Sequence, residues 1–127
     1  MPPVVLRKMI MAGLQVGVMD SVMVEATDFI LERLDSLGQA ELASRLTLNC
    51  AEGYIKPQHV NDLPVTIIDV FDGCSLQQDV RDETYKCYLH AKLAHLKTGG
   101  NFPFLSRSEE VNLHLVIHLR NFECAVA

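Results

Sequence analysis

Two histidines near the end of the chain have a spacing that could support metal chemistry. His114 and His118 lie four positions apart, so a helix would place both imidazoles on one face. A zinc site would still need one or two further ligands, which His90 or His95 could supply only if the fold brought them close. We therefore expect partly exposed helix residues here, and the sequence predicts neither a metal site nor a cofactor.

A nucleophilic site is also incomplete. Cys74 and Ser75 are adjacent, but no residue beside them in the sequence offers a base that could activate either one. The Gly-x-Ser-x-Gly pattern, which presents a nucleophile on a sharp turn, is absent because the segment from Gly13 to Gly17 has Gln15 at its centre. These residues predict no catalytic nucleophile.

The charge and the composition exclude several classes of partner. The 127 residues include 11 basic and 16 acidic side chains, for a net charge of −5. An acidic chain without a basic stripe binds poorly to nucleic acid and to anionic lipid, because neutralisation of phosphates supplies most of that affinity. No apolar run reaches the roughly 18 residues of a transmembrane segment. The four cysteines have no Cys-x-x-Cys spacing, so we expect an intracellular protein with reduced thiols.

The first half of the chain is predicted to be helical. Residues 4–11 form a short apolar segment, and Asp20 or Ser21 can cap a second helix whose apolar residues recur every three or four positions. Gly38 is placed to end this helix, and another follows over about 39–48, which makes a helical hairpin. The apolar stripe of the second helix consists of Val22, Ala26, Phe29, Ile30, Leu34 and Leu37.

The second half alternates strands and helices. The runs 65–70 and 92–96 have the composition of short strands, and a helix over about 76–88 separates them. This order implies a parallel sheet with a right-handed crossover. Two such strands leave both sheet edges open, although the first has the composition of a strand buried on both faces. The sequence therefore contains the end of a sheet without its beginning.

A last helix is expected to start at Ser106 or Ser108. Ser106 and Glu109 have the spacing of a capping box, in which each side chain bonds a free backbone N–H group of the first turn. The apolar face of this helix would consist of Val111, Leu115, Leu119 and Phe122.

Two segments resemble the last two strands of the α/β-hydrolases. Pro64-Val-Thr-Ile-Ile-Asp-Val-Phe-Asp72 resembles the penultimate strand, which the catalytic acid of that family follows. His95-Leu-Lys-Thr-Gly-Gly-Asn-Phe-Pro103 resembles the final strand and the glycine-rich loop that carries the catalytic histidine. The resemblance implies the α/β class and a single partial domain, the C-terminal part of an α/β-hydrolase fold. Cap-like helices would occupy about 1–63, and the strand-helix-strand-helix end of the sheet about 64–127.

The loop after the second strand has asparagine where the resemblance places histidine. An amide cannot take up a proton near neutral pH, so Asn101 removes the base that hydrolysis requires. Asp72 lies at the acid position or within one residue of it, and a turn residue before Gly73 is the alternative reading. Asn101 is expected either to brace the turn or to make a polar contact in a relic pocket. The loop consists of Gly99, Gly100, Asn101, Phe102 and Pro103.

Longer strings are similar to the maspardin family, which is identified with this fold but not with catalysis. They include Glu41-Leu-Ala-Ser-Arg-Leu-Thr-Leu-Asn49 and Ala94-His-Leu-Lys-Thr-Gly-Gly-Asn-Phe-Pro103, and the similarity extends over about 13–122. The resemblance implies a non-catalytic protein that binds the cytoplasmic tail of a T-cell surface co-receptor. It also implies negative regulation of that co-receptor, a role in endosomal and Golgi trafficking, and a cytoplasmic location that includes peripheral association with endosomal or trans-Golgi membranes.

Two alternatives stay open from the sequence. A serine esterase would need an upstream nucleophile and a base other than Asn101. A truncated form without independent function would account for the missing strands, and it would leave a bare edge on the strand 65–70.

Overall fold

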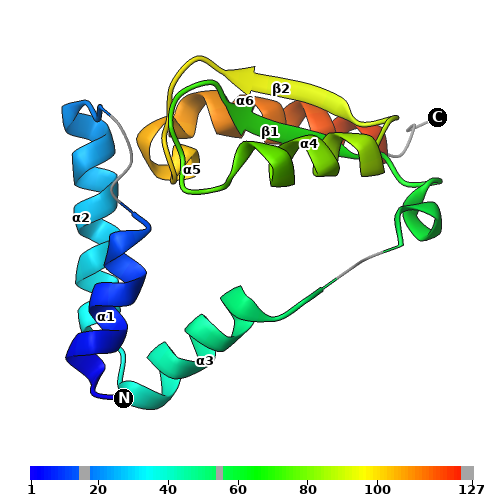
Figure 1. Cartoon of the computed structure of the whole chain (residues 1–127). Helices are drawn as coiled ribbons and strands as arrows, with labels where there is room; N and C mark the ends of the chain where they lie inside the picture. Colours follow the sequence, from blue (N-terminus) through cyan, green and yellow to red (C-terminus); the bar gives the residue numbers. More distant parts are fainter. Residues whose placement is uncertain (15–17, 54–55, 124–127) are drawn as a thin grey trace.

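The structure, a computed structural model, describes residues 1–14, 18–53 and 56–123. The first helices are α1 (Pro3–Ala12), α2 (Ser21–Asp35), α3 (Gln39–Cys50) and the 3₁₀ helix η1 (Pro57–Val60). They are followed by β1 (Thr66–Val70), α4 (Gln78–Cys87), β2 (Lys92–Leu96), α5 (Pro103–Ser106), α6 (Ser108–Leu119) and the 3₁₀ helix η2 (Arg120–Phe122). Figure 1 shows α1, α2 and α3 as a helical arm beside the part of the chain that contains the two strands.

The helical arm has a small hydrophobic core of its own. Leu6, Leu34 and Leu42 are buried together where the three helices meet, and each comes from a different helix. Asp20 caps α2 as predicted, because its carboxylate accepts a hydrogen bond of 2.9 Å from the Met23 N–H group. The apolar residues that pack around this core are Ile10, Leu14, Ile30, Leu31, Leu37, Ala43 and Leu46.

Two details of the predicted hairpin were wrong. Gly38 does not end α2, which stops at Asp35 with Ser36 as its C-terminal cap; Gly38 is instead the N-terminal cap of α3, with φ −81°. Val22 and Phe29 of the predicted apolar stripe are 44% and 43% exposed. The buried side of α2 is rotated from that stripe, because α2 packs on the loop after β2 as well as on α1.

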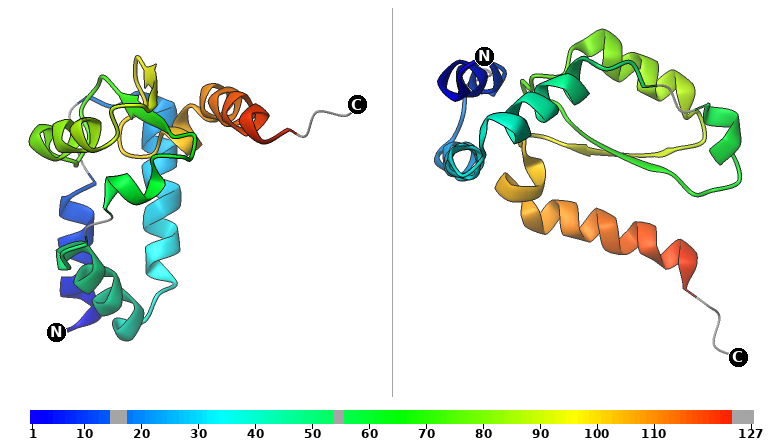
Figure 2. Two further views of the ribbon diagram at one scale, coloured as in Figure 1. Left: turned by 90° about the vertical axis from the view of Figure 1, so that its right-hand side faces the viewer. Right: turned by 90° about the horizontal axis from the view of Figure 1, so that it is seen from below.

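The sheet has two parallel strands, as the sequence predicted. Thr66 pairs with Lys92 at one end, and Val70 pairs with Leu96 at the other. Helices α4 and α6 lie on opposite faces of these strands (Figure 2). Val70, Leu96 and Val111 of α6 form a second small core. The side chains of β1 are mostly half-buried rather than buried, since no described residue forms a strand beside its outer edge.

The start of the last helix differs from the prediction. Ser106 makes no capping box, because its hydroxyl donates hydrogen bonds of 2.8 Å to the Gly99 carbonyl and 3.2 Å to the Phe102 carbonyl. Helix α6 begins at Ser108 without a side-chain cap. Of its predicted apolar face only Val111 is buried, and the other three members, Leu115, Leu119 and Phe122, are exposed.

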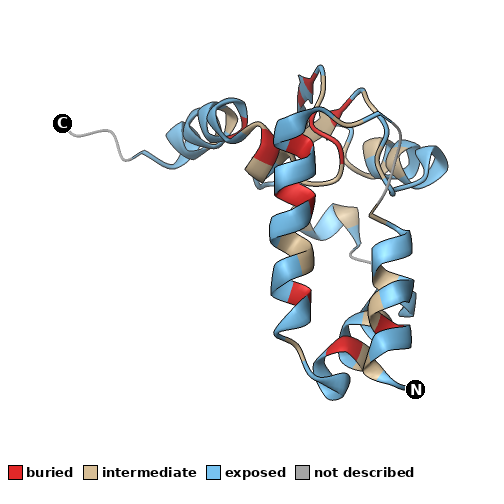
Figure 3. Ribbon diagram, turned by 90° about the vertical axis from the view of Figure 1, so that its left-hand side faces the viewer, coloured by how far each residue is buried: buried red, intermediate tan, exposed pale blue. Residues whose placement is uncertain are grey.

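One polar contact fastens the helical arm to the sheet. The Arg107 guanidinium binds the Asp20 carboxylate at the start of α2, and its Nε donates a hydrogen bond of 3.1 Å to the Thr98 hydroxyl. The Met23 N–H bond and then the Arg107 pairing lower the pKa of Asp20 from its ordinary value. Figure 3 shows that buried residues are few and that much of the helix surface is exposed. No helix in the described ranges is both long and apolar enough to cross a membrane.

Candidate functional site

The ends of the two strands bring Asp72 to the glycine-rich loop. Parallel strands end at the same edge of a sheet, so the segments that follow β1 and β2 meet there. The Asp72 carboxylate accepts hydrogen bonds of 2.9 Å from the Gly99 N–H group and 3.0 Å from the Gly100 N–H group. Both glycines are buried. Asp72 therefore binds backbone amides in the structure rather than a side chain that it could orient.

Backbone conformation and close packing explain both glycines. Gly100 has φ +67°, which L side chains rarely adopt. A Cβ atom on Gly99 would lie 2.9 Å from the Pro103 Cβ atom and 3.0 Å from a Val70 methyl group. The loop therefore lies directly against β1 and the start of α5, which fixes the position of the next residue, Asn101.

Both polar atoms of the Asn101 side chain have backbone partners. The Oδ1 atom accepts a hydrogen bond of 2.5 Å from the Ser75 N–H group, which lies between β1 and α4. The Nδ2 atom donates a hydrogen bond of 3.1 Å to the Leu14 carbonyl, which follows α1. The amide thus connects three segments that are distant in the sequence. It makes no hydrogen bond with Asp72, so the two predicted site residues share a loop but not a direct contact.

The space beside this loop is nearly filled. Met19, Met23, Ala26 and Thr27, from α2 and the residues before it, line a cavity of about 10 Å³ against Gly73 and the residues Gly99 to Phe102. That volume holds at most about one water molecule. Phe102 also packs edge-on against Phe104, with ring centroids 6.2 Å apart. The described residues therefore leave no room for a substrate at this position.

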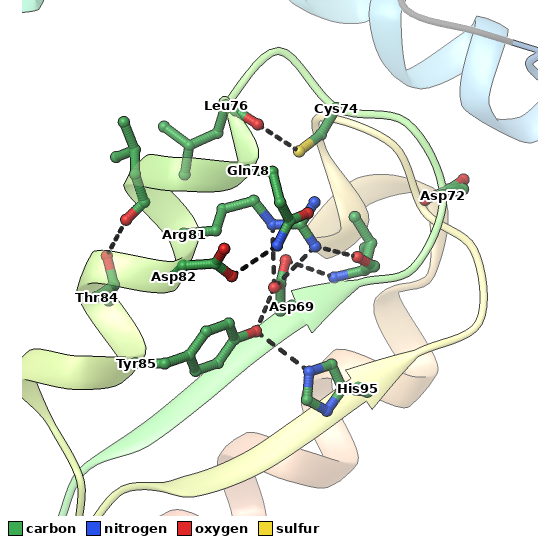
Figure 4. Close-up of polar contacts among 12 residues, drawn as sticks. Asp69, Asp72, Cys74, Leu76, Gln78, Arg81, Asp82, Thr84, Tyr85 and His95 are labelled. Carbon is green, nitrogen blue, oxygen red and sulfur yellow. Dashed lines mark hydrogen bonds and ion pairs between the residues drawn. The ribbon is translucent and has the colours of Figure 1, made fainter.

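A second polar cluster lies on the other side of β1, where sequence reasoning placed no site (Figure 4). Asp69 points towards α4 and forms an ion pair with Arg81, with a shortest N–O distance of 2.8 Å. The Tyr85 hydroxyl donates to the same Asp69 carboxylate oxygen and lies 3.1 Å from His95 Nε2. His95 in turn stacks on Phe71, with centroids 4.7 Å apart.

The cluster shifts two acidities. Burial, followed by the hydrogen bond to Asp69, raises the pKa of Tyr85 to about 12. Burial alone would raise the pKa of Asp69, but the hydrogen bonds from Tyr85 and Arg81 outweigh it, so this pKa lies below its ordinary value. Asp69 is therefore a charged acceptor and Tyr85 a neutral donor at neutral pH. The cluster holds α4 on the sheet and leaves no free carboxylate.

A signal for this cluster was present in the sequence. Asp69 is the one charged residue in the apolar run 65–70, and such a residue requires a partner when a helix covers it. Arg81 and Tyr85 are four positions apart, which places them on one face of α4. His95 is exposed and hydrogen-bonded, so the expectation of a core histidine was wrong.

The remaining candidates do not form a site. His118 Nδ1 lies 2.8 Å from the Thr66 hydroxyl, and no group of three potential metal ligands occurs among the described residues. The Cys74 thiol donates to the Leu76 carbonyl at 3.6 Å. Cys50, Cys74 and Cys87 are free thiols. The segment around Gln15 and the fourth cysteine, Cys124, lie outside the described residues.

Comparison with known proteins gives one consistent result. The chain is 52% identical to maspardin of Homo sapiens and of Mus musculus over 122 residues, which is 96% of this chain and 40% of each of those proteins. Maspardin of Danio rerio is also 52% identical over 122 residues, which is 39% of its length. No protein-family model and no solved structure matches the chain. The chain thus spans about two fifths of the length of the curated relatives that it matches.

The fold and the relatives together define the class. The chain is an α/β protein with a small parallel sheet, and it corresponds to part of an α/β-hydrolase fold. More narrowly it is a maspardin homologue, and its coverage of maspardin is consistent with the predicted C-terminal portion.

Proposed function

We propose that this chain is a non-catalytic binding protein of the maspardin kind. The observation that supports this proposal is the state of Asn101, whose amide occupies the loop position expected of a catalytic histidine. Its oxygen and its nitrogen are both engaged by backbone groups, at 2.5 Å and 3.1 Å. An amide cannot act as a general base, and this one has no free lone pair directed at a cavity.

The contacts of Asp72 support the same proposal. A catalytic acid in a hydrolase orients the base by accepting its N–H group. Here the two carboxylate oxygens are taken by Gly99 and Gly100. The acid and the loop are therefore retained as a structural connection between the ends of β1 and β2, which keeps the shape of this edge without its chemistry.

The partner in this proposal is the cytoplasmic tail of a T-cell surface co-receptor, and the chain acts in negative regulation of that co-receptor and in endosomal and Golgi trafficking. This part rests on the similarity to maspardin over 96% of the chain. We place the protein in the cytoplasm, with peripheral association at endosomal or trans-Golgi membranes. Fractionation of cells that express the tagged chain tests the location, and recovery solely from the membrane-free fraction would contradict the peripheral part.

Turnover of an ester tests the non-catalytic part. We expect the purified chain to hydrolyse p-nitrophenyl acetate no faster than its Asp72→Asn variant does, because no base connects Asp72 to a substrate. The comparison removes the background from surface nucleophiles, which both proteins share. A rate that falls with Asp72→Asn in a variant that stays folded would indicate a working acid, and the esterase alternative would then replace this proposal.

A further inference from the structure

The outer edge of β1 has backbone groups without partners in the described part of the chain. Lys92 N donates to the Val65 carbonyl, and Phe71 N donates to the Leu96 carbonyl, so the odd-numbered residues of this run face β2. Because a parallel ladder alternates, Thr66, Ile68 and Val70 direct their amides and carbonyls away from β2.

Side chains close one end of this edge. The Val70 N–H group donates to Asp69 Oδ1 at 2.8 Å, and the Val70 carbonyl accepts from Arg81 at 2.5 Å. Thr66 and Ile68 have no comparable cap in the described residues. The free part of the edge is therefore short and is centred on Ile67, which limits the length of any strand that could pair with it.

Helix α6 lies under the same strand and runs in the opposite direction. His118, near its end, binds Thr66 at the start of β1, whereas Val111, near its beginning, packs with Val70 at the end of β1. Figure 2 shows this helix along one side of the strands. The middle of α6 thus lies near the middle of the open edge.

The surface of α6 that does not face the sheet is apolar and uncovered. A helix that is hydrophobic around most of its circumference is normally buried. Single exposed apolar residues are common, but a continuous group on one helix marks a contact surface. The exposed members are Leu113 (58%), Leu115 (47%), Val116 (50%), Ile117 (42%), Leu119 (60%) and Phe122 (54%).

The charges at the ends of α6 indicate what covers this surface. Glu109 and Glu110 are exposed at its start, and Arg120 is exposed just after its end. Two copies of α6 placed antiparallel would set the acidic end of each beside the basic end of the other. A two-fold interface has this self-complementary form, since each residue pair occurs twice.

We propose that two copies of this chain associate through β1 and α6 about a two-fold axis near Ile67. Thr66 of one copy pairs with Ile68 of the other in an antiparallel ladder, and each such pair exchanges both N–H···O bonds. The same rotation that makes the strands antiparallel makes the α6 helices antiparallel, because α6 follows β1 in the opposite direction. The interface therefore combines an extended sheet with an apolar helix pair that has charged ends.

A second copy fits these observations better than an unrelated strand does. A foreign strand added to β1 would use the open edge, but nothing in its chemistry requires acidic residues at one end of α6 and a basic residue at the other. The proposal is independent of the proposed function, because it uses no residue of the Asp72 and Asn101 loop.

Sedimentation velocity over a range of concentrations tests the proposal. We expect the wild-type chain to reach twice the mass of a single chain, with Arg120→Glu weakening self-association roughly tenfold. Reversal of both ends in one chain, Glu109→Lys, Glu110→Lys and Arg120→Glu together, restores the complementarity and should recover the wild-type affinity. Arg45→Glu, an exposed charge reversal on α3, serves as the matched control and should leave association unchanged.

The outcomes separate the occupants. A wild-type chain that stays monomeric at every concentration, while circular dichroism shows it folded, overturns the proposal. Association that Arg120→Glu weakens but the triple reversal does not recover would also contradict the antiparallel pairing. If the folded monomer instead binds a synthetic apolar strand peptide, the edge takes a foreign strand and the second copy is excluded.

Discussion

The Asn101 side chain donates a hydrogen bond to the carbonyl of Leu14, which lies 87 positions earlier in the chain, at a distance of 3.1 Å. The same side chain accepts from the Ser75 N–H group. One amide thus connects the helical arm, the segment after β1 and the loop after β2. A residue that the sequence marks as the loss of a base is, in the structure, a connection between parts of the fold.

Asn101→Asp tests this connection. The aspartate oxygen can still accept from Ser75, but the second oxygen faces the Leu14 carbonyl without a proton to donate. We expect a loss of about 1–3 kcal/mol in the free energy of unfolding, measured by urea denaturation at neutral pH. Asn61→Asp adds the same charge at an exposed position and should change stability by less than about 0.5 kcal/mol. Equal effects of the two substitutions would show that the Leu14 contact contributes nothing.

Asp72→Asn tests the other half of the loop. The carboxylate accepts from two buried glycine N–H groups, whereas an amide has one accepting oxygen and would direct an NH₂ group at the second donor. We expect a loss of about 1–3 kcal/mol. Asp62→Asn, on an exposed residue, is the matched control. A stability that is unchanged at Asp72 would mean that solvent satisfies the glycine amides and that the loop does not depend on this contact.

Gly99→Ala tests the close approach of the loop to β1. The added methyl group would lie within about 3 Å of Pro103 and Val70, and neither neighbour is the free end of a flexible chain. We expect overpacking to cost about 1–3 kcal/mol, visible as a lower midpoint of thermal unfolding. Gly53, where a Cβ atom would meet nothing within 4 Å, is the control for the loss of glycine itself. The account fails at this point if Gly99→Ala unfolds at the same temperature as Gly53→Ala.

Tyr85 should titrate late. Its pKa is raised from 10.0 to about 12, so the neutral phenol is favoured by folding. The stabilisation is fully present below the unfolded value of 10.0, and it is lost as the pH rises through about 12. The difference between wild-type and Tyr85→Phe ultraviolet absorbance isolates the phenolate of this residue. A midpoint near 10.0 in the folded chain would contradict the hydrogen bond to Asp69.

The sequence was sufficient for the order of elements and for the sheet. The β-branched run 65–70 and the Asp20 cap are local signals, and the structure has β1 at Thr66–Val70 and α2 capped by Asp20. The open edges were also predictable, because a strand count needs no coordinates. Such features depend on neighbours in the sequence, and this is why reading along the chain found them.

The features that were missed depend on contacts between distant residues. Ser106 has a capping-box spacing, but its hydroxyl bonds the Gly99 carbonyl, which the fold brings beside it. The stripe on α2 was misplaced because a loop near Gly100, far along the chain, covers Met23. The partners of Asn101 are likewise remote, so the sequence indicated which residue stands there but not what it binds.

Binding of the co-receptor tail is the measurement that most directly tests the central claim. Isothermal titration of the chain with a synthetic peptide of that cytoplasmic tail, and with a scrambled peptide of equal composition, gives the comparison. A cooperative thermal melt of the same preparation first establishes that the chain is folded. The account predicts saturable binding of the tail peptide and none of the scrambled one. A folded chain that binds neither peptide, or both equally, would contradict the claim that this maspardin homologue acts by binding that partner.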